Sequence, residues 1–329
     1  MHQTPLNSIN SLRILLSPLN WGLGHVSRTV PIIQLLLAQN NEVIICCDEN
    51  QEQYYRTYFP DLWYVPHQGY PFYFQGKGNW TLDILRNYVS LKHYLSEEKK
   101  KVEDLVEKFN SDLVISDQRF GFVSKKVRSI VISHQLNLPV PNWNIVAKFI
   151  NKRLLSKFDE VWIPDTTEQK YSGVLSNGRH KGKYFIGTKS RFEKVEKNAV
   201  KTYEYLGIVS GPSPYNQQLL DLLMKKLAAS NHKYAIIVPN ALYQENKNSN
   251  YIALIPSPEH EEFVRLIKES KTVISRSGYS TIMDLIQTGN DGILIPTPGQ
   301  AEQLYLAKLH QNHPSWKFKT EKEFSLMTL

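Results

Sequence analysis

The chain has 329 residues, of which 41% are hydrophobic and 21% charged, a balance typical of a globular protein and not of a disordered one. At about 150 residues per domain the length predicts two domains, and no apolar run approaches the roughly 20 residues that span a bilayer. The two cysteines, Cys46 and Cys47, are adjacent in an apolar run, which excludes a disulfide-stapled scaffold. The polar first residues resemble no secretory signal, so a cytoplasmic protein is expected.

The charge balance favours an anionic partner. Thirty-nine Lys and Arg against 31 Asp and Glu give a formal net charge of +8. Much of the excess lies within residues 179–201, where eight basic residues accompany two glutamates. Neither paired zinc ligands nor an aromatic-basic strand signature is present, so nucleic acid is not expected as a partner. A phosphate-bearing ligand or an anionic lipid headgroup fits this charge better.

Short apolar runs alternate with segments of helical period, and the pattern occurs twice along the chain. Such alternation predicts an α/β protein with two Rossmann-like parallel-sheet domains, each covered by helices on both faces. Strands are expected at 13–17, 42–47, 112–116, 129–133 and 160–163, and then at 205–209, 234–238, 252–255, 272–275 and 292–295. Helices are expected near 26–37, over 81–109 in one or two pieces, and at 217–229, 259–268, 281–287 and 300–310.

Residues 187–201 are basic and poor in strand signals, which makes them the best linker candidate. We therefore expect an N-terminal domain over 1–186 and a C-terminal domain over 202–329, facing a cleft. Open parallel sheets bind ligands beyond the carboxyl ends of their strands. The informative loops are those that follow Ser17, Ser116, Ser133, Val209 and Ser275.

A glycine-rich turn follows the first expected strand and reads Trp21-Gly22-Leu23-Gly24-His25. Glycines allow close backbone approach, and the free N–H groups at a helix start favour an anion. The turn is not the dinucleotide fingerprint, because the third glycine of that motif is missing. Glycine required for turn geometry alone is the structural alternative.

The same arrangement of strand, small polar loop and helix start recurs in the second half, in Ser275-Arg276-Ser277-Gly278-Tyr279-Ser280-Thr281. Asp284 follows one helical turn later. This segment predicts a second anion site. The structural alternative is that Ser280 or Thr281 is an ordinary helix N-cap.

Two further loops in the second half carry polar groups at the same expected sheet edge. Ser210 and Gly211 follow a strand and offer peptide N–H groups to phosphate. Glu302 and Gln303, in the segment 296–303, offer carboxylate and amide groups that suit sugar hydroxyls. A solvated helix start is the structural alternative for the second loop.

The order of these motifs resembles that of the inverting GT-B glycosyltransferases of family 28, which includes the peptidoglycan lipid-intermediate N-acetylglucosaminyltransferase. The resemblance covers roughly residues 13–310 and is weakest between 68 and 157. It implies metal-independent transfer of a sugar, expected to be an N-acetylhexosamine, from a UDP-sugar to a cell-envelope glycan or lipid-linked acceptor. The UDP-sugar is a co-substrate, so the resemblance implies no cofactor and no metal ion.

Carried over residue by residue, the resemblance places Gly22 and Gly24 in an acceptor loop that ends at His25. Arg191, in Gly187-Thr-Lys-Ser-Arg191, is similar to the family's donor-diphosphate arginine. Asp284 stands where the family has a ribose-binding glutamate, and Gln303 where it has the first of two sugar-binding glutamines, the second being Leu304 here. The predicted donor-binding residues are Arg191, Ser210, Gly211, Ser277, Gly278, Ser280, Thr281, Asp284, Glu302 and Gln303.

Two residues of the first half are candidates for catalysis. His25 is the expected general base, because an inverting displacement needs a deprotonated hydroxyl and imidazole titrates near neutral pH. Asp117 ends an expected strand at the same edge and could orient the imidazole or act as the base itself. An ion pair with Arg119 is the structural alternative for Asp117. His134, after the next strand, is either a cleft residue or a satisfied loop histidine, and the second is expected.

Two alternatives to transfer remain open. The sequence Gly22-Leu-Gly-His25-Val-x-Arg28 also resembles a UDP-sugar hydrolase of the same fold, in which water replaces the acceptor. A non-catalytic nucleotide-sugar binding protein would retain Gly278 and Asp284 without needing His25.

Aromatic and basic clusters of the first half have two interpretations each. Phe72, Tyr73, Phe74 and Trp80 suit either a hydrophobic acceptor or membrane surface, or core packing. Residues 148–157 form a basic amphipathic stretch that could contact anionic lipid at the inner face of a membrane, or be an ordinary solvated helix face. Residues 97–104, with alternating charges, predict a solvated helix face.

Overall fold

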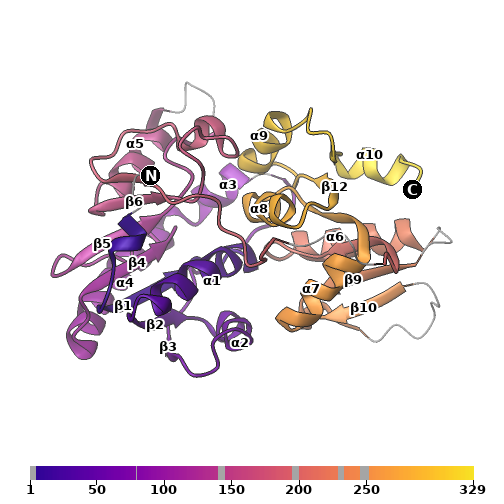
Figure 1. Ribbon diagram of the computed structural model, residues 1–329. Coiled ribbons are helices and arrows are strands. Elements are labelled where there is room, and N and C mark those ends of the chain that lie inside the picture. Colours follow the sequence, from indigo (N-terminus) through magenta and orange to yellow (C-terminus); the bar gives the residue numbers. More distant parts are fainter. Residues whose placement is uncertain (1–4, 79, 140–144, 195–199, 229–232, 245–251) are drawn as a thin grey trace. The chain divides into compact units, whose positions relative to one another are not determined.

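The computed structural model describes residues 5–78, 80–139, 145–194, 200–228, 233–244 and 252–329 (Figure 1). The chain divides into two compact units. The first unit comprises Met1–Phe72 and Ile84–Arg191, and the second comprises Tyr73–Asp83 and Phe192–Leu329. The division after Arg191 falls inside the segment expected to be a linker. The assignment of residues 73–83 to the second unit has no counterpart in the sequence analysis.

The first unit contains a seven-stranded parallel sheet in the order β3-β2-β1-β4-β5-β6-β7. Its strands are β1 (Arg13–Pro18), β2 (Glu42–Cys47), β3 (Trp63–Pro66), β4 (Leu113–Asp117), β5 (Arg128–Ile132), β6 (Glu160–Ile163) and β7 (Lys183–Phe185). The helical elements between them are η1 (Pro5–Ser8), α1 (Leu23–Ala38), α2 (Glu49–Arg56), α4 (Tyr88–Phe109), α5 (Ile145–Leu155) and η2 (Gly173–Ser176). Helix α3 (Trp80–Arg86) spans the boundary at residue 83.

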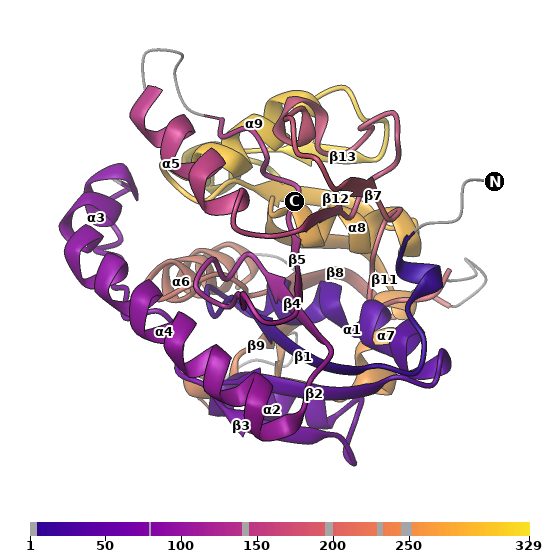
Figure 2. The same ribbon diagram turned by 90° about the vertical axis from the view of Figure 1, so that its left-hand side faces the viewer.

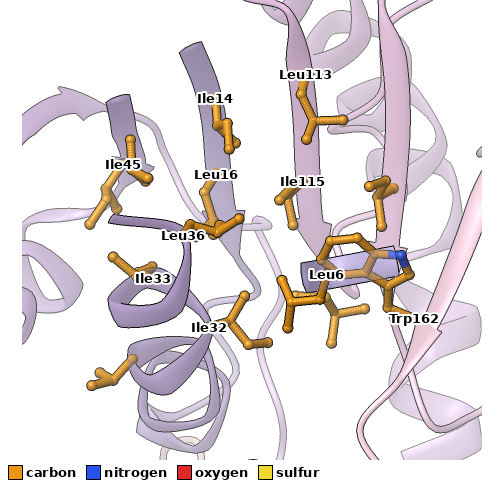
Figure 3. Close-up of a cluster of buried hydrophobic side chains, with 14 of the residues drawn as sticks. Leu6, Ile14, Leu16, Ile32, Ile33, Leu36, Ile45, Leu113, Ile115 and Trp162 are labelled. Atoms are coloured by element: carbon orange, nitrogen blue, oxygen red, sulfur yellow. The ribbon is translucent and has the colours of Figure 1, made fainter. Parts of the chain in front are cut away.

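The two faces of the first sheet are buried by different helices, because successive side chains of a strand point to opposite faces. Ile14 and Leu16 of β1 pack with Ile32, Ile33 and Leu36 of α1 (Figure 3). Leu15 points to the other face and packs with Val102, Leu105 and Val106 of α4. Figure 2 shows the α4 ribbon on the side of the sheet away from α1. The strands are therefore apolar on both sides, as the continuous apolar runs in the sequence predict.

The second unit contains a six-stranded parallel sheet in the order β10-β9-β8-β11-β12-β13. Its strands are β8 (Tyr203–Ile208), β9 (Tyr234–Val238), β10 (Ile252–Pro256), β11 (Ser270–Arg276), β12 (Asp291–Ile295) and β13 (Trp316–Phe318). Its helical elements are α6 (Tyr215–Leu227), η3 (Asn240–Leu242), α7 (His260–Glu269), α8 (Tyr279–Thr288), α9 (Ala301–Leu309) and α10 (Glu321–Leu326). Leucines of α6 and Phe324 of α10 bury one face of this sheet.

The fold class expected from the sequence is confirmed, and each expected strand is present within a few residues of its expected limits. The expected helix over 81–109 is two helices, α3 and α4. Three short edge strands, β3, β7 and β13, and the short helices α2 and α10 were not predicted from the sequence.

Both cysteines are free and buried on β2. Burial raises the pKa of the Cys46 thiol to about 12, which keeps it protonated and unreactive at neutral pH.

Within the part of the chain that the structure describes, no helix combines the length and hydrophobicity needed to traverse a bilayer.

Candidate functional site

The glycine-rich turn connects β1 to α1 in the first unit. Gly22 is the N-cap of α1 and has φ 99° and ψ 164°. A side chain is strained at this positive φ, so glycine is needed here for backbone geometry. Because α1 begins at Leu23, Gly24 and His25 lie in its first turn, where backbone N–H groups have no partner within the helix.

His25 and Asp117 are brought together, as the sequence predicts for two loops at the same sheet edge. Asp117 is the last residue of β4 and lies opposite Pro18 of β1 in the strand register. Nδ1 of His25 lies 3.1 Å from Oδ2 of Asp117. The His25 side chain is 16% exposed and that of Asp117 is fully buried, so the imidazole is the member of the pair that reaches solvent.

The carboxylate of Asp117 is paired with Arg28 of α1, a residue that the sequence analysis did not select. Nε of Arg28 donates to Oδ1 and Oδ2 at 3.0 and 2.9 Å, and Nη2 also donates to Oδ1. Burial alone would raise the pKa of Asp117, but the adjacent Arg28 and His25 outweigh it and hold that pKa below its usual range. The alternative of an Asp117–Arg119 ion pair is not observed.

Arg119 instead pairs with a residue of α4 that was expected to be solvated. Nε of Arg119 donates to Oε1 of Glu98, and Nε2 of His67 lies 3.0 Å from the same oxygen. All three side chains are buried. The expectation of a fully solvated face over residues 97–104 is therefore wrong at Glu98, because that position turns toward the sheet edge and meets a buried arginine.

Glu98, Arg119 and His67, which we call the Glu98 cluster, contact the glycine-rich turn through residues 67–72. Arg119 Nη2 donates to the carbonyl of Gln68, and the N–H of Tyr70 donates to Oδ1 of Asn20 at 3.0 Å. The rings of Trp21 and Phe72 are in contact, with centroids 4.9 Å apart. Asn20 and Trp21 immediately precede Gly22, so these contacts fix the approach of the chain to His25.

His134 follows β5 and is buried, as expected for a satisfied histidine. Its Nδ1 lies 3.3 Å from Nη1 of Arg28. His134 therefore contacts the same arginine that contacts His25.

In the second unit, the loop after β11 carries the second anion motif. Strand β11 ends at Arg276, and Gly278 is the N-cap of α8, which begins at Tyr279. The alternative of Ser280 or Thr281 as the N-cap is therefore wrong, and both lie in the first helical turn. Asp284 lies in the second turn and is 9% exposed.

Gln303 connects the loops that follow β11 and β12. Its Oε1 accepts a hydrogen bond from the N–H of Thr297 at 2.8 Å, and its backbone carbonyl accepts one from Oγ of Ser277 at 3.3 Å. Its Nε2 would lie 4.0 Å from a Cβ built on Gly278. Ser277, Gly278 and Gln303 thus form one structural cluster, with Glu302 beside it on α9.

The loop after β8 lies beside this cluster, because β8 is the neighbour of β11 in the sheet. Oγ of Ser275 donates to the carbonyl of Ile208 at 2.9 Å, which ties the ends of the two strands together. Ser210 and Gly211 follow directly. Gly211 has φ 101°, and a Cβ built on it would meet no atom within 4 Å.

Two arginines of the predicted donor motifs, Arg276 and Arg191, make contacts within their own units. Arg276 is buried, donates from Nη2 to the carbonyl of Tyr215 at 3.0 Å, and lies 2.8 Å from Glu321 through Nη1. It fastens the motif to α6 and α10. Arg191 groups with the first unit, where its Nη1 donates to the hydroxyl of Tyr54. Its role at the donor diphosphate stays a prediction.

Residues 73–83, which we call the strap, pack within the second unit. The N–H of Gly78 donates to the hydroxyl of Tyr215 at 3.0 Å, and Trp80 stacks on the same ring with centroids 5.5 Å apart. Phe74 lies against Trp80, with ring centroids 4.1 Å apart. For Phe74 and Trp80, packing is the interpretation that the structure supports, whereas Tyr73 is exposed.

The strap also touches the loop that precedes Gln303. A Cβ added to Gly299, which has φ 74°, would lie 1.7 Å from the carbonyl oxygen of Gly78.

Among the residues that the structure describes, no group of three or more His, Cys, Asp or Glu side chains could hold a metal ion.

Comparisons with known proteins place this geometry in a structural class. Residues 238–313 match the family model described as the glycosyltransferase family 28 C-terminal domain. This segment contains the loops after β11 and β12. No curated protein matches the sequence significantly.

The structure is similar over its length to several solved glycosyltransferases. Spinosyn rhamnosyltransferase SpnG complexed with thymidine diphosphate matches with a TM-score of 0.59 and 14% identity, over 95% of this chain and 90% of that one. The fold is GT-B. Acinetobacter baumannii MurG matches with a TM-score of 0.53 and 15% identity, over 96% and 87%. Arabidopsis thaliana UGT89C1 complexed with UDP-L-rhamnose matches at 0.60 and 10%, over 95% and 86%.

The close approach of Gly299 to the strap predicts a specific effect of Gly299→Ala. The new methyl group would collide with Gly78 and would also be strained at a positive φ, at a cost of about 1 to 3 kcal/mol for the strain alone. We expect a lower melting temperature and faster proteolytic cleavage within residues 73–83.

Gly211→Ala is the matched control, because Gly211 has a positive φ and open space around it. Equal losses of melting temperature and equal cleavage in the two variants would show that the strap does not depend on its contact with Gly299.

Proposed function

We propose that this chain is an inverting glycosyltransferase that moves a sugar from a UDP-sugar to a hydroxyl of a glycan or lipid-linked acceptor. The observation that carries the proposal is the match of residues 238–313 to the family 28 C-terminal domain, on a chain with the GT-B fold. The matched segment contains Ser277, Gly278 and Gln303. Hydrogen bonds from Ser277 and Thr297 to Gln303 join their loops into one cluster.

In the proposed donor complex, the diphosphate lies at the first turn of α8. The N–H groups of that turn and the partial positive charge of a helix N-terminus favour an anion there. The hydroxyls of Ser280 and Thr281, the backbone at Ser277 and the backbone after Ser210 supply further donors. Arg191 is proposed to neutralise the departing diphosphate, so that no metal ion is needed for that step.

Two carboxylates and one amide are assigned to the sugar hydroxyls. Asp284 accepts from the ribose hydroxyls in this proposal, and Glu302 accepts from the transferred sugar, taken to be an N-acetylhexosamine. Because Oε1 of Gln303 is already used by Thr297, its amide NH₂ is the part left to donate to a ligand.

His25 is the proposed general base and Asp117 orients it. The geometry supports this order, because Asp117 is fully buried behind Arg28 while His25 retains exposed surface. Removal of the hydroxyl proton by Nε2 would leave the acceptor oxygen free to attack the anomeric carbon. Hydrolysis of the UDP-sugar and nucleotide-sugar binding without chemistry are the alternatives that the experiments below distinguish.

Asp284→Asn tests the donor assignment. Loss of a charged hydrogen-bond partner costs roughly 1.5 to 3 kcal/mol, which corresponds to a weakening of UDP affinity by about tenfold or more. The measurement is calorimetric titration with UDP. Asp291→Asn is the control, because Asp291 is exposed at the opposite end of β12. Wild-type affinity in Asp284→Asn would refute the assignment to ribose.

His25→Ala tests the base. General-base loss lowers the rate by about 10² to 10⁴-fold, whereas UDP affinity should be retained because it depends on the second unit. Turnover is followed as UDP release in EDTA, with and without a panel of acceptors, and His93→Ala on the exposed surface of α4 is the control.

Three outcomes of this assay separate the candidate functions. UDP release only with an acceptor supports transfer, and release in its absence supports hydrolysis. UDP binding without release under either condition supports a binding protein. Retention of more than about a tenth of wild-type kcat in His25→Ala would remove His25 as the base.

The α5 helix supports a proposal about where the enzyme acts. Ile145, Val146 and Phe149 are 70%, 69% and 61% exposed, and the helix also carries Lys148, Lys152 and Arg153 without an acidic residue. Burial, with a smaller effect of the cations Lys99 and Arg153, lowers the pKa of Lys157, which follows α5. We assign this surface to the headgroup region of an anionic membrane.

Vesicle flotation tests this assignment. Wild-type protein should bind phosphatidylcholine–phosphatidylglycerol vesicles but not pure phosphatidylcholine, and high salt should weaken the binding. Val146→Asp with Phe149→Asp should abolish it. Leu326→Asp, at an exposed leucine of α10, is the control. Equal binding by the control and the double variant would contradict the assignment.

A further inference from the structure

A buried arginine contacts both members of the His25–Asp117 pair. Arg28 is 3% exposed and forms a fork on the Asp117 carboxylate through Nε and Nη2. Its Nη2 also lies 2.8 Å from Nδ1 of His25. These positions follow from the helix, because Arg28 lies three residues after His25 and the two side chains share one face of α1.

Two groups therefore compete for Nδ1 of His25. Oδ2 of Asp117, at 3.1 Å, can only accept a proton from it, whereas a guanidinium nitrogen can only donate one to it. A single Nδ1 satisfies one of these contacts at a time. Only a neutral ring whose proton lies on Nδ1, donated to Asp117, leaves Nε2 able to accept a proton. Protonation of both ring nitrogens would place an imidazolium 2.8 Å from the Arg28 guanidinium, which is a repulsive arrangement.

Other ionisable groups lie around this cluster. The described residues bring Arg28 from α1, Asp117 from β4 and His134 from the loop after β5 to the cluster. Tyr55 of α2 reaches it through Thr29, whose hydroxyl lies 2.5 Å from that of Tyr55. Because Arg28 and Asp117 carry opposite charges, His25 faces a neutral ion pair and not an isolated carboxylate.

We propose that Arg28 is a positioning residue for His25: by pairing with Asp117 it keeps the imidazole neutral and able to accept a proton. The use of that proton acceptor in glycosyl transfer rests on the proposed function. Without Arg28, the carboxylate would form an ion pair with the imidazolium, which has no free lone pair to act as a base. Asp117 could then still orient the ring, but it would also hold the ring in its inactive form.

The inference is tested by the pKa of His25, measured by NMR from the titration of its Cε1–H signal. The signal is assigned by its loss in His25→Ala, and the measurement needs no substrate. Arg28→Met leaves Asp117 unpaired and should raise the pKa of His25 by about one unit or more. Asp117→Asn leaves Arg28 charged and should lower it. The double variant Arg28→Met with Asp117→Asn should return it to within about half a unit of the wild-type value.

Where the unpaired carboxylate in Arg28→Met prevents folding, Arg28→Lys is the second variant. Arg28→Lys keeps the charge but loses the fork, so the pKa of His25 should stay close to that of the wild type. An unchanged pKa in Asp117→Asn, or a double variant that differs from the wild type as much as Asp117→Asn does, would overturn the inference. Failure of the proposed function would be recognised separately, as wild-type protein that does not bind UDP.

Discussion

All paired strands in both sheets are parallel, and this constraint determines which residues can meet. In a parallel sheet the chain returns to the same end before each new strand begins. Every strand-to-helix loop therefore lies at one edge of the sheet. His25 and Asp117 are 92 positions apart in the sequence and meet because β1 and β4 are neighbours. In the second unit, the order β8-β11-β12 places the loops at Gly211, Gly278 and Gln303 side by side in the same way.

The first unit maintains two clusters of buried charges at this edge, Arg28 with Asp117 and Arg119 with Glu98. Buried ion pairs contribute little net stability, because the loss of hydration offsets the attraction between the charges. Their effect here is geometric. The Asp117 cluster fixes the side chain of His25 through contacts with its Nδ1. The Glu98 cluster, through Gln68 and Tyr70, fixes the turn from which α1 begins. The glycine-rich turn is therefore constrained from two directions.

The sequence predicted the central strands well because each is a continuous apolar run, which is typical of strands buried on both faces. It missed β3, β7 and β13, which are edge strands of three or four residues with partly exposed side chains. Helices α2 and α10 carried a readable signal, since Asp48 with Gln51 and Thr320 with Glu323 form capping boxes. The pairing of His25 with Asp117 could be predicted from strand ends. The roles of Arg28 and Glu98 could not, because periodicity does not show which charged helix residue meets an opposite charge in the interior.

The strap limits how the second unit can be exchanged between related proteins. A chimaera joined within residues 187–201 would exchange the C-terminal half of the chain and leave residues 73–83 from the original parent. The incoming domain would then meet a foreign segment at Tyr215 and Gln218, which hydrogen-bond to the strap, and at Gly299, where the strap leaves no room for a Cβ. Exchange of the second unit therefore requires three junctions instead of one, so that the short segment travels with the domain against which it packs.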